Sequence, residues 1–323
     1  MKELTLRQAQ NEAVDEEMKR DSSVFVLGES VRSFSSTGIW EGLVDKYGSE
    51  RVRDTAISET AILGGAIGAA ATGMRPIASL MFVDFMGIVG DELLNQLQMR
   101  YMFGGKAKLP LTIIASCGGG RSAAAQHSKS LYGYFMAIKG LKIVIPSTAY
   151  DAKGLLKSAI REDNPVLFLI HKMPGLAHLT SQIPDEEYLI PLGKADIKRE
   201  GSDVTVVATG LMVYRALAAA AKLQEKGVNI EVIDPRTLVP LDKQAIIDSV
   251  KKTGKLVIID EDPKTGGAAA EISAIVAEEA FDFLDAPIKR VCALDTPIPF
   301  SPVLEKFWMP DEEDLIKAVT EIM

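Results

Sequence analysis

The sequence predicts an α/β protein built of two doubly wound domains. Strand-like segments alternate with helix-like segments along most of the chain. The predicted strands are continuously apolar, which is typical of a parallel sheet covered by helices on both faces. The alternation stops once, over Met173–Gly201, where prolines and a polar run indicate a surface connection. We therefore predict a first domain over residues 1–180, a linker over 181–201 and a second domain over 202–323.

The composition narrows the class of protein. The chain has 323 residues, of which 47% are hydrophobic and 25% are charged, and these values suit a globular protein of about two domains. The formal net charge of −8 argues against nucleic acid as the main partner, because phosphate binding needs clustered Lys and Arg. The longest apolar run, Ala61–Met74, is short and glycine-rich, so we expect no membrane span.

The cysteines and the N-terminus indicate a compartment. Cys117 and Cys292 are the only two cysteines, and they have neither the number nor the spacing of a disulfide framework or a metal site. The N-terminus has the pattern of a charged helix rather than of a signal peptide. We therefore expect the reducing cytoplasm.

Apolar periodicity predicts the elements of the first domain. Residues 4–21 have helical periodicity with mixed charges, and residues 24–27 form a short buried strand that ends at Gly28. Thr148 and Asp151 form a capping signature. The remaining prediction is a loop over 30–37, helices over 38–47, 59–70, 85–102 (capped by Asp84) and 152–161, and strands over 51–53, 76–81, 111–115, 141–145 and 166–170.

The second domain repeats the alternation on a smaller scale. Its predicted strands cover 204–208, 228–233, 256–260 and 288–294, and its predicted helices cover 211–226, 242–252 and 268–279. We find no convergent acid, base and nucleophile in this half of the sequence. Packing and assembly are therefore its expected role.

A carboxylate, Glu59, opens an otherwise uncharged helix of small residues. Ser58 is a good N-cap, and an acid in the first turn suits the positive end of the helix dipole, so a capping acid is one interpretation. Gly64, Gly65 and Gly68 cost about 1 kcal/mol each relative to Ala in a helix. Helices that tolerate this cost usually let another backbone, a partner chain or a ligand come close. The second interpretation is therefore a carboxylate used in acid–base chemistry.

Several polar or aromatic residues follow predicted strands. Glu29, Glu59, Phe85 and the glycine-rich loop that leads to His127 all do so. In open parallel sheets the ligand crevice lies beyond the carboxyl ends of the strands, so we expect these residues to converge. His127 suits proton transfer near neutral pH, although a lone loop histidine is more often structural. Phe85 is either plain core or a face for a flat heteroaromatic ring.

Taken together and in order, several motifs resemble one family, the beta subunit of the thiamine-diphosphate-dependent decarboxylase in 2-oxo acid dehydrogenase complexes. The motifs lie at Arg53–Glu59, Met81–Phe85, Tyr101–Lys106, Gln126–Ser128, Asp234–Leu238 and Pro297–Pro299. Within the family the chain is most similar to acetoin dehydrogenase beta subunits, and pyruvate and branched-chain members share many of the same residues. The resemblance implies a pyrimidine-binding, transketolase-like domain followed by a transketolase C-terminal-like domain.

The resemblance also implies roles for single residues around the cofactor thiamine diphosphate. Glu59 hydrogen-bonds the aminopyrimidine ring nitrogen and so favours the imino tautomer, whose nitrogen removes the proton of the reactive thiazolium carbon. Phe85 stacks on the pyrimidine, and Ile57 and Met81 line its pocket. His127 acts as an acid–base group or stabilises the charged intermediate.

Two further sites are implied in the same way. Glu29 belongs to the cofactor site, on an acidic path between two such sites. The backbone near Leu111, Ala159, Glu162 and Asn164 resembles the monovalent-cation site of the family, which K⁺ would occupy.

The family binds Mg²⁺ through a Gly-Asp-Gly motif followed by an Asn, and this chain contains no Gly-Asp-Gly. The resemblance therefore implies an alpha subunit that holds Mg²⁺ and the diphosphate, within an α2β2 heterotetramer. It implies a small-molecule substrate, either acetoin or a 2-oxo acid such as pyruvate or a branched-chain acid. A lipoyl-bearing acyltransferase core would receive the two-carbon or acyl unit.

Two other classes of function compete with this interpretation. A nucleotide-dependent oxidoreductase could use the triple glycine Gly118–Gly120, but the segment is neither a Walker motif nor GxGxxG. A non-catalytic assembly subunit is the other, and the presence of both Glu59 and His127 argues against it.

Overall fold

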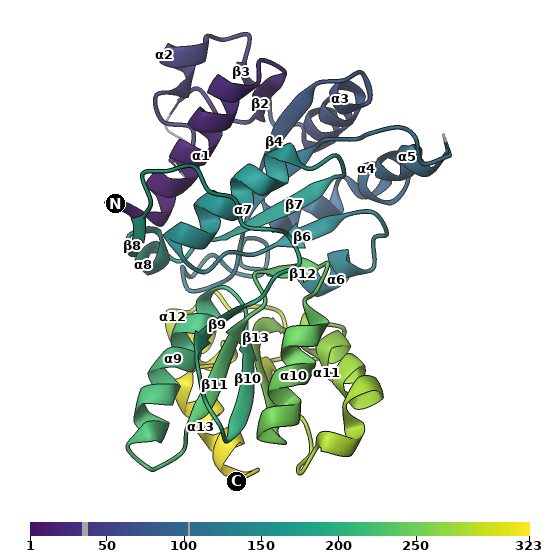
Figure 1. The fold of residues 1–323 in the computed structure, drawn as a ribbon. Coiled ribbons are helices and arrows are strands. Elements are labelled where there is room, and N and C mark those ends of the chain that lie inside the picture. The colour runs from purple at the N-terminus through teal and green to yellow at the C-terminus, as the bar shows by residue number, and fades with distance from the viewer. Residues whose placement is uncertain (34–37, 103) are drawn as a thin grey trace. The chain divides into compact units, whose positions relative to one another are not determined.

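The computed structural model describes residues 1–33, 38–102 and 104–323. Residues 34–37 of the predicted loop and Phe103 of one motif lie outside this description. The chain divides into two compact units (Figure 1). The first comprises Met1–Cys117 and Ala137–Leu192, and the second comprises Gly118–Met136 and Gly193–Met323. The change at residue 193 falls within the predicted linker. No sequence pattern predicted that Gly118–Met136 belongs with the second unit.

The first unit is an α/β layer structure. Its strands are β1 (Lys2–Thr5), β2 (Val24–Gly28), β3 (Val52–Asp54), β4 (Arg75–Phe82), β5 (Thr112–Cys117), β6 (Lys142–Val144), β7 (Val166–His171) and β8 (Thr180–Ile183). Its helices are α1 (Leu6–Arg20), α2 (Leu43–Tyr47), α3 (Glu59–Ala71), α4 (Gly90–Leu94), α5 (Met99–Met102), α7 (Ala149–Arg161) and α8 (Pro174–Ala177), with the 3₁₀ turns η1 (Val83–Gly87) and η2 (Gln96–Gln98).

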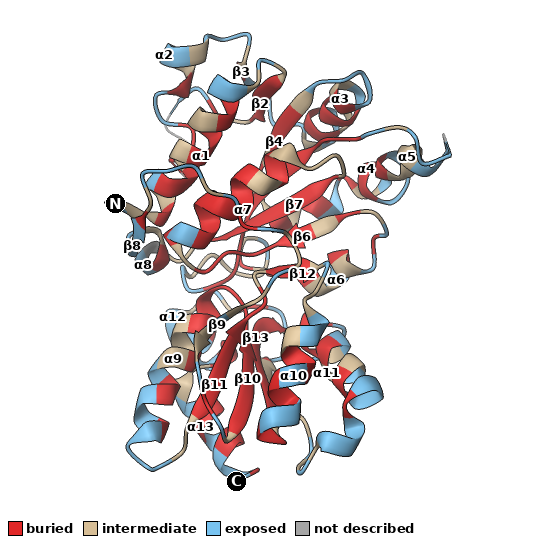
Figure 2. Cartoon of the chain, in the orientation of Figure 1, coloured by how far each residue is buried: buried red, intermediate tan, exposed pale blue. Residues whose placement is uncertain are grey.

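The main sheet of this unit is parallel, as predicted. Its strands follow the order β6-β7-β5-β4-β2-β3, and every pair in that order is parallel. The strands are buried along most of their length (Figure 2). Because parallel strands share one direction, the residues that follow β2, β3 and β4 lie at the same edge of the sheet.

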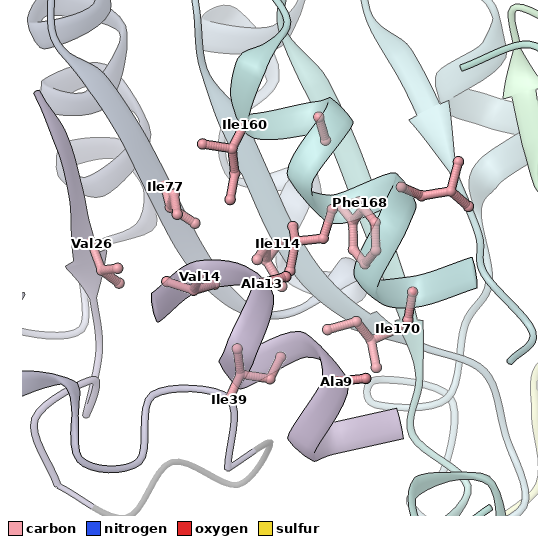
Figure 3. Close-up of a cluster of buried hydrophobic side chains, with 14 of the residues drawn as sticks. Ala9, Ala13, Val14, Val26, Ile39, Ile77, Ile114, Ile160, Phe168 and Ile170 are labelled. Atoms are coloured by element: carbon pink, nitrogen blue, oxygen red, sulfur yellow. The ribbon is translucent and has the colours of Figure 1, made fainter. Parts of the chain in front are cut away.

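One face of this sheet is covered by α1 and α7, which pack against each other. Figure 3 shows side chains from this layer, among them Ala13 of α1, Ile160 of α7 and Phe168 of β7. Helix α3 packs on β4 but contributes nothing to that cluster, so it covers the opposite face. This arrangement confirms a doubly wound sheet.

Two helix predictions in the first unit are wrong. The predicted helix over 85–102 is broken into η1, α4, η2 and α5, because Gly87 and Gly90 interrupt it and weaken any continuous helix. Asp84 lies inside η1 rather than at its N-cap, which is Phe82. The predicted helix over 38–47 is reduced to α2, since Gly42 has a left-handed backbone with φ of 73°.

The second unit is built around another sheet. The strands of this unit are β9 (Asp196–Arg199), β10 (Val204–Ala208), β11 (Ile230–Asp234), β12 (Thr237–Val239), β13 (Leu256–Pro263) and β14 (Lys289–Ala293), of which β12 is not part of this sheet. Its helices are α6 (Tyr132–Met136), α9 (Leu211–Gln224), α10 (Lys243–Thr253), α11 (Ala268–Glu279), α12 (Pro302–Trp308) and α13 (Glu312–Thr320), with the 3₁₀ turn η3 (Phe281–Phe283).

This second sheet has the order β14-β13-β10-β11-β9. Its strand pairs are parallel except for β9, which runs antiparallel to β11 and comes from the predicted linker. Helices α9 and α13 pack together, and α10 packs with α11 (Figure 1). None of the described helices has the length and apolarity that a bilayer crossing requires.

Candidate active site

The carboxyl edge of the first sheet gathers three of the predicted site residues. Gly28, the last residue of β2, pairs with Asp54 of β3 and with Ser79 of β4. Glu29 follows β2, Phe85 lies in η1 directly after β4, and Glu59 begins α3 after β3. The Thr55 backbone N–H donates to the Gly28 carbonyl at 3.0 Å, which fixes the start of the connection to α3 beside β2.

The Glu59 carboxylate is available as an acceptor. It makes no hydrogen bond or ion pair with the residues that the structure describes, and the side chain is partly exposed. Ser58 occupies the N-cap position, yet its side chain makes no capping hydrogen bond. Neither side chain therefore caps α3 by hydrogen bonding, and the carboxylate can be shared with a ligand.

The glycines of α3 leave one face of that helix open. Ala61, Gly65 and Gly68 are exposed at a spacing that places them on one side of the helix. A Cβ atom added at Gly65 or Gly68 would find no described atom within 4 Å. Within residues 1–33, 38–102 and 104–323, no segment fills the space beside Gly65 and Gly68.

Apolar side chains surround the same edge of the sheet. Phe85 packs edge-to-face on Phe82, with ring centroids 5.5 Å apart and an interplanar angle of 78°, and it is half-buried. Met81 is also half-buried, whereas the Ile57 side chain is 75% exposed. These side chains provide an aromatic ring and an aliphatic surface. No described residue covers the Ile57 side chain.

A buried ion pair at this edge escaped the sequence analysis. The Lys172 ammonium, directly after β7, lies 3.9 Å from an Asp84 carboxylate oxygen and 4.8 Å from the centroid of the Phe82 ring. The two side chains are 4% and 2% exposed. A lysine two residues after the apolar run 166–170 was the available signal, because a strand of this kind ends at the ligand edge of the sheet.

The predicted cation-site residues lie at the opposite, amino edge of the sheet. Leu111 precedes β5, and Ala159, Glu162 and Asn164 surround the end of α7. The Val166 N–H donates to the Leu111 carbonyl at 2.8 Å, and the Glu162 N–H donates to the Ala159 carbonyl at 3.3 Å. Each carbonyl oxygen keeps a second lone pair, so these oxygens could still coordinate an ion.

His127 belongs to the second unit, within the segment Gly118–Met136. Its backbone N–H donates to the Ala124 carbonyl at 3.3 Å, and its side chain is partly exposed. The neighbouring hydroxyls of Ser128 and Ser130 are buried and have no hydrogen-bond partner among the described residues. Buried hydroxyl groups without a hydrogen-bond partner are unusual in folded proteins. The Ser128 and Ser130 hydroxyls can therefore still form hydrogen bonds with another group.

The second unit contains an acidic cluster that the sequence analysis missed. Asp260, Glu261 and Asp262 end β13 and are at most 2% exposed. The Tyr132 hydroxyl donates to Asp260, and the Gly133 N–H donates to Asp262 at 2.8 Å. The available signal was the run of three consecutive acidic residues at the end of an apolar strand, because packing alone does not require buried acids there.

Burial changes the protonation of this cluster. Burial, together with the neighbouring Asp260 charge, raises the pKa of Asp262 to about 8. Burial also raises the pKa of Asp260 to about 6. The pair therefore holds a proton near neutral pH, where an exposed pair of aspartates would hold none.

Within the described residues, neither a metal site of three ligand side chains nor a disulfide is present. No group of three or more His, Cys, Asp or Glu side chains in residues 1–33, 38–102 and 104–323 could hold a metal ion. Neither Cys117 nor Cys292 forms a disulfide. Burial raises the pKa of the Cys292 thiol to about 12, so it is a poor nucleophile.

Two family models match this chain, one in each half. The model of the transketolase pyrimidine-binding domain matches residues 2–175, and that of the transketolase C-terminal domain matches residues 193–315. The chain is 47% identical to the acetoin:2,6-dichlorophenolindophenol oxidoreductase subunit beta of Bacillus subtilis (strain 168), over 99% of this chain and 97% of that protein. It is 44% identical to the 2-oxoisovalerate dehydrogenase subunit beta of the same strain, over 97% of this chain and 96% of that protein.

A solved structure extends the comparison of folds. A split-gene transketolase, described as an inactive beta4 tetramer, matches with a TM-score of 0.80 and 24% identity, covering 99% of this chain and 98% of that one. The predicted two-domain, transketolase-like fold and the predicted family resemblance are both confirmed.

Proposed function

This chain belongs to the family of transketolase-like beta subunits of acetoin and 2-oxo acid dehydrogenases, and from that premise we propose that it is the beta subunit of a thiamine-diphosphate-dependent enzyme that cleaves acetoin. The two-carbon unit passes to a lipoyl domain on an acyltransferase core. Decarboxylation of pyruvate or of a branched-chain 2-oxo acid is the alternative. The observation that carries the proposal is the Glu59 carboxylate, free to accept a hydrogen bond at the carboxyl edge of a parallel sheet.

The residues at this edge fit the pyrimidine half of the cofactor. When bound, thiamine diphosphate supplies a nucleophilic carbon that can store the electron pair of a cleaved carbon–carbon bond. Glu59 holds a proton against the pyrimidine ring nitrogen, and Phe85 orients the ring by stacking. Met81 and Ile57 exclude water from it. Ile57 is exposed in this chain, so covering it requires a further surface.

His127 and Glu29 complete the proposed chemistry. His127 moves a proton at the oxygen of the substrate carbonyl or hydroxyl, a role that suits imidazole near neutral pH. Glu29, directly after β2 at the same edge as Glu59, belongs to the acidic path that leads away from the pyrimidine.

An alpha subunit supplies the other half of the site in this proposal. A doubly charged diphosphate needs a metal held by oxygen ligands, and the described residues hold no group of three candidate ligand side chains. The open glycine face of α3 and the exposed Ile57 offer a surface to that subunit, and the assembly is an α2β2 heterotetramer with Mg²⁺ on the alpha side. Cys117 and Cys292 form no disulfide, and this favours the reducing cytoplasm as the compartment of the enzyme.

A monovalent cation, K⁺, is proposed at the amino edge of the first sheet. The carbonyl oxygens of Leu111, Ala159, Glu162 and Asn164 would coordinate it with their unused lone pairs. That edge lies opposite Glu59 and Phe85, so the ion would stabilise the connections around α7 rather than take part in catalysis.

Calorimetry tests the incompleteness of the site. Titrating the purified single chain with thiamine diphosphate and Mg²⁺ should give weak or no heat of binding, because Glu59 and its neighbours contact only the pyrimidine end. Adding the alpha chain should produce tight, Mg²⁺-dependent binding. Tight binding to the single chain would mean that it holds the whole site and that the heterotetramer proposal is wrong.

The reconstituted pair then identifies the substrate. Rates of dye reduction should be measured with acetoin, pyruvate and branched-chain 2-oxo acids, and we expect the largest kcat/KM for acetoin. A larger kcat/KM for one of the 2-oxo acids would replace acetoin with that acid.

A further inference from the structure

The segment that carries His127 has an unfavourable backbone. Ser122, Ala124 and Leu131 all have positive φ angles, between 53° and 58°. Residues other than glycine rarely adopt this conformation, and they persist in it only where the surrounding structure enforces it. Contacts from outside the segment must therefore fix its shape.

Two buried carboxylates hold the first part of the segment. The Gly119 N–H donates to Glu261, and Glu305 accepts from the Gly120 N–H at 2.9 Å and from the Ser122 N–H at 2.7 Å. Glu261 and Glu305 are 2% and 3% exposed. Gly119 itself fits tightly, because an added Cβ would lie 3.0 Å from the Met309 methyl group.

Two further carboxylates hold the last part. Asp262 accepts from the Gly133 N–H, and Asp260 accepts from the Tyr132 hydroxyl. A Cβ added at Gly133 would lie 2.5 Å from an Asp262 carboxylate oxygen and 2.7 Å from the Gly267 Cα atom, so only glycine fits there. His127 lies between these two anchored ends.

We propose that Glu261, Asp262 and Glu305 are positioning residues, which clamp the segment Gly118–Met136 onto the second unit and thereby set the place of His127. The proposal rests on the proposed catalytic role of His127. Through these carboxyl groups the end of β13 and helix α12 contribute to the reaction without touching the substrate.

Glu305→Gln tests the clamp, because an amide keeps the shape of the side chain but has one acceptor oxygen instead of two. In the full-length chain, amide hydrogen exchange in peptides covering residues 118–133 should become about 10- to 100-fold faster, as expected for the loss of a hydrogen bond to a charged group. Glu312→Gln is the matched control. Glu312 pairs with Arg215 at 2.7 Å on the same unit and should leave this exchange unchanged.

Turnover of acetoin by the enzyme reconstituted with the alpha chain gives the second readout. Glu305→Gln should reduce turnover by about 10-fold or more. The double variant with His127→Ala should be no slower than His127→Ala alone, because both substitutions remove the same function, that of His127. Additive losses, or unchanged exchange together with unchanged turnover, would overturn the clamp. If His127→Ala has no effect, the proposed role of His127 fails, and the exchange rates alone decide the clamp.

A pH profile of amide exchange tests whether the Asp262 carboxyl group itself holds the segment. The folded chain keeps the Asp262 proton up to about pH 8, whereas an unfolded chain releases it near pH 4. The folded state therefore binds more protons between these values, so its stability falls as pH rises through them. The ionisable groups of this cluster are Asp260 and Glu261 on β13, Tyr132 on α6 and Cys292 on β14.

Protection factors for residues 118–133, which correct for the intrinsic pH dependence of exchange, should fall between about pH 6 and pH 8 in the unmodified chain. Asp262→Asn keeps an oxygen to accept from the Gly133 N–H but carries no titrating proton, so its protection factors should stay level over that range. A decline of the same size in Asp262→Asn would remove Asp262 from the clamp.

Discussion

Glu59→Gln is expected to slow the deprotonation of the bound cofactor's thiazolium carbon by about 100- to 10,000-fold, the range typical of a positioned proton-transfer group. The amide N–H of glutamine can donate a hydrogen bond to the pyrimidine nitrogen, but it cannot transfer its proton to that nitrogen as a carboxyl group can. The fold should be intact, because the Glu59 carboxylate makes no hydrogen bond or ion pair with the described residues.

Hydrogen–deuterium exchange at that carbon, followed in the reconstituted enzyme loaded with thiamine diphosphate and Mg²⁺, measures this rate directly. Glu41→Gln, an exposed glutamate of the same unit, is the control and should exchange at the normal rate. Normal exchange in Glu59→Gln would show that Glu59 does not set the protonation of the cofactor and would return it to the role of a first-turn acid.

His127→Ala is expected to separate the two halves of the reaction. The cofactor proton should still exchange at the normal rate, since Glu59 controls that step. Overall turnover with acetoin and a lipoyl acceptor should fall by about 100-fold or more, because a general acid–base group is lost after cofactor activation.

His178→Ala provides the matched histidine control, since His178 follows the short helix α8 of the first unit, away from every role proposed here. Near-normal turnover in His127→Ala would place His127 among structural loop histidines. A parallel loss of cofactor exchange would instead mean that His127 acts before substrate enters, which contradicts the division of roles proposed here.

The elements with strong periodicity were predictable, and those that depend on glycine were not. Strand β10 and helix α11 lie at the predicted residues, because continuous apolar runs and helical spacing are local properties. The interrupted region from η1 to α5 was predicted as one helix, although Gly87 and Gly90 stand inside it. Helices α12 and α13 received no prediction at all.

The candidate site was predictable in part. Glu29, Glu59 and Phe85 follow strands of one parallel sheet, so their common edge could be inferred from strand order in the sequence. The convergence of His127 with them stays a prediction. The Asp84–Lys172 pair joins residues 88 positions apart, and no spacing rule connects such residues.

By itself, the sequence determined the family, the two doubly wound sheets and the carboxylate that begins α3. Motifs, apolar runs and glycine positions involve residues that are close together in the sequence, so they can be recognised without the tertiary structure. Only the tertiary structure decided that residues 118–136 belong with the C-terminal unit. Their anchors, Gly119 with Glu261 and Ser122 with Glu305, lie 142 and 183 residues apart. Sequence periodicity cannot predict such hydrogen bonds, because they join residues that only folding brings together. The backbone N–H groups of Gly119 and Ser122 have no partner in local secondary structure, and the carboxyl groups of β13 and α12 accept from them.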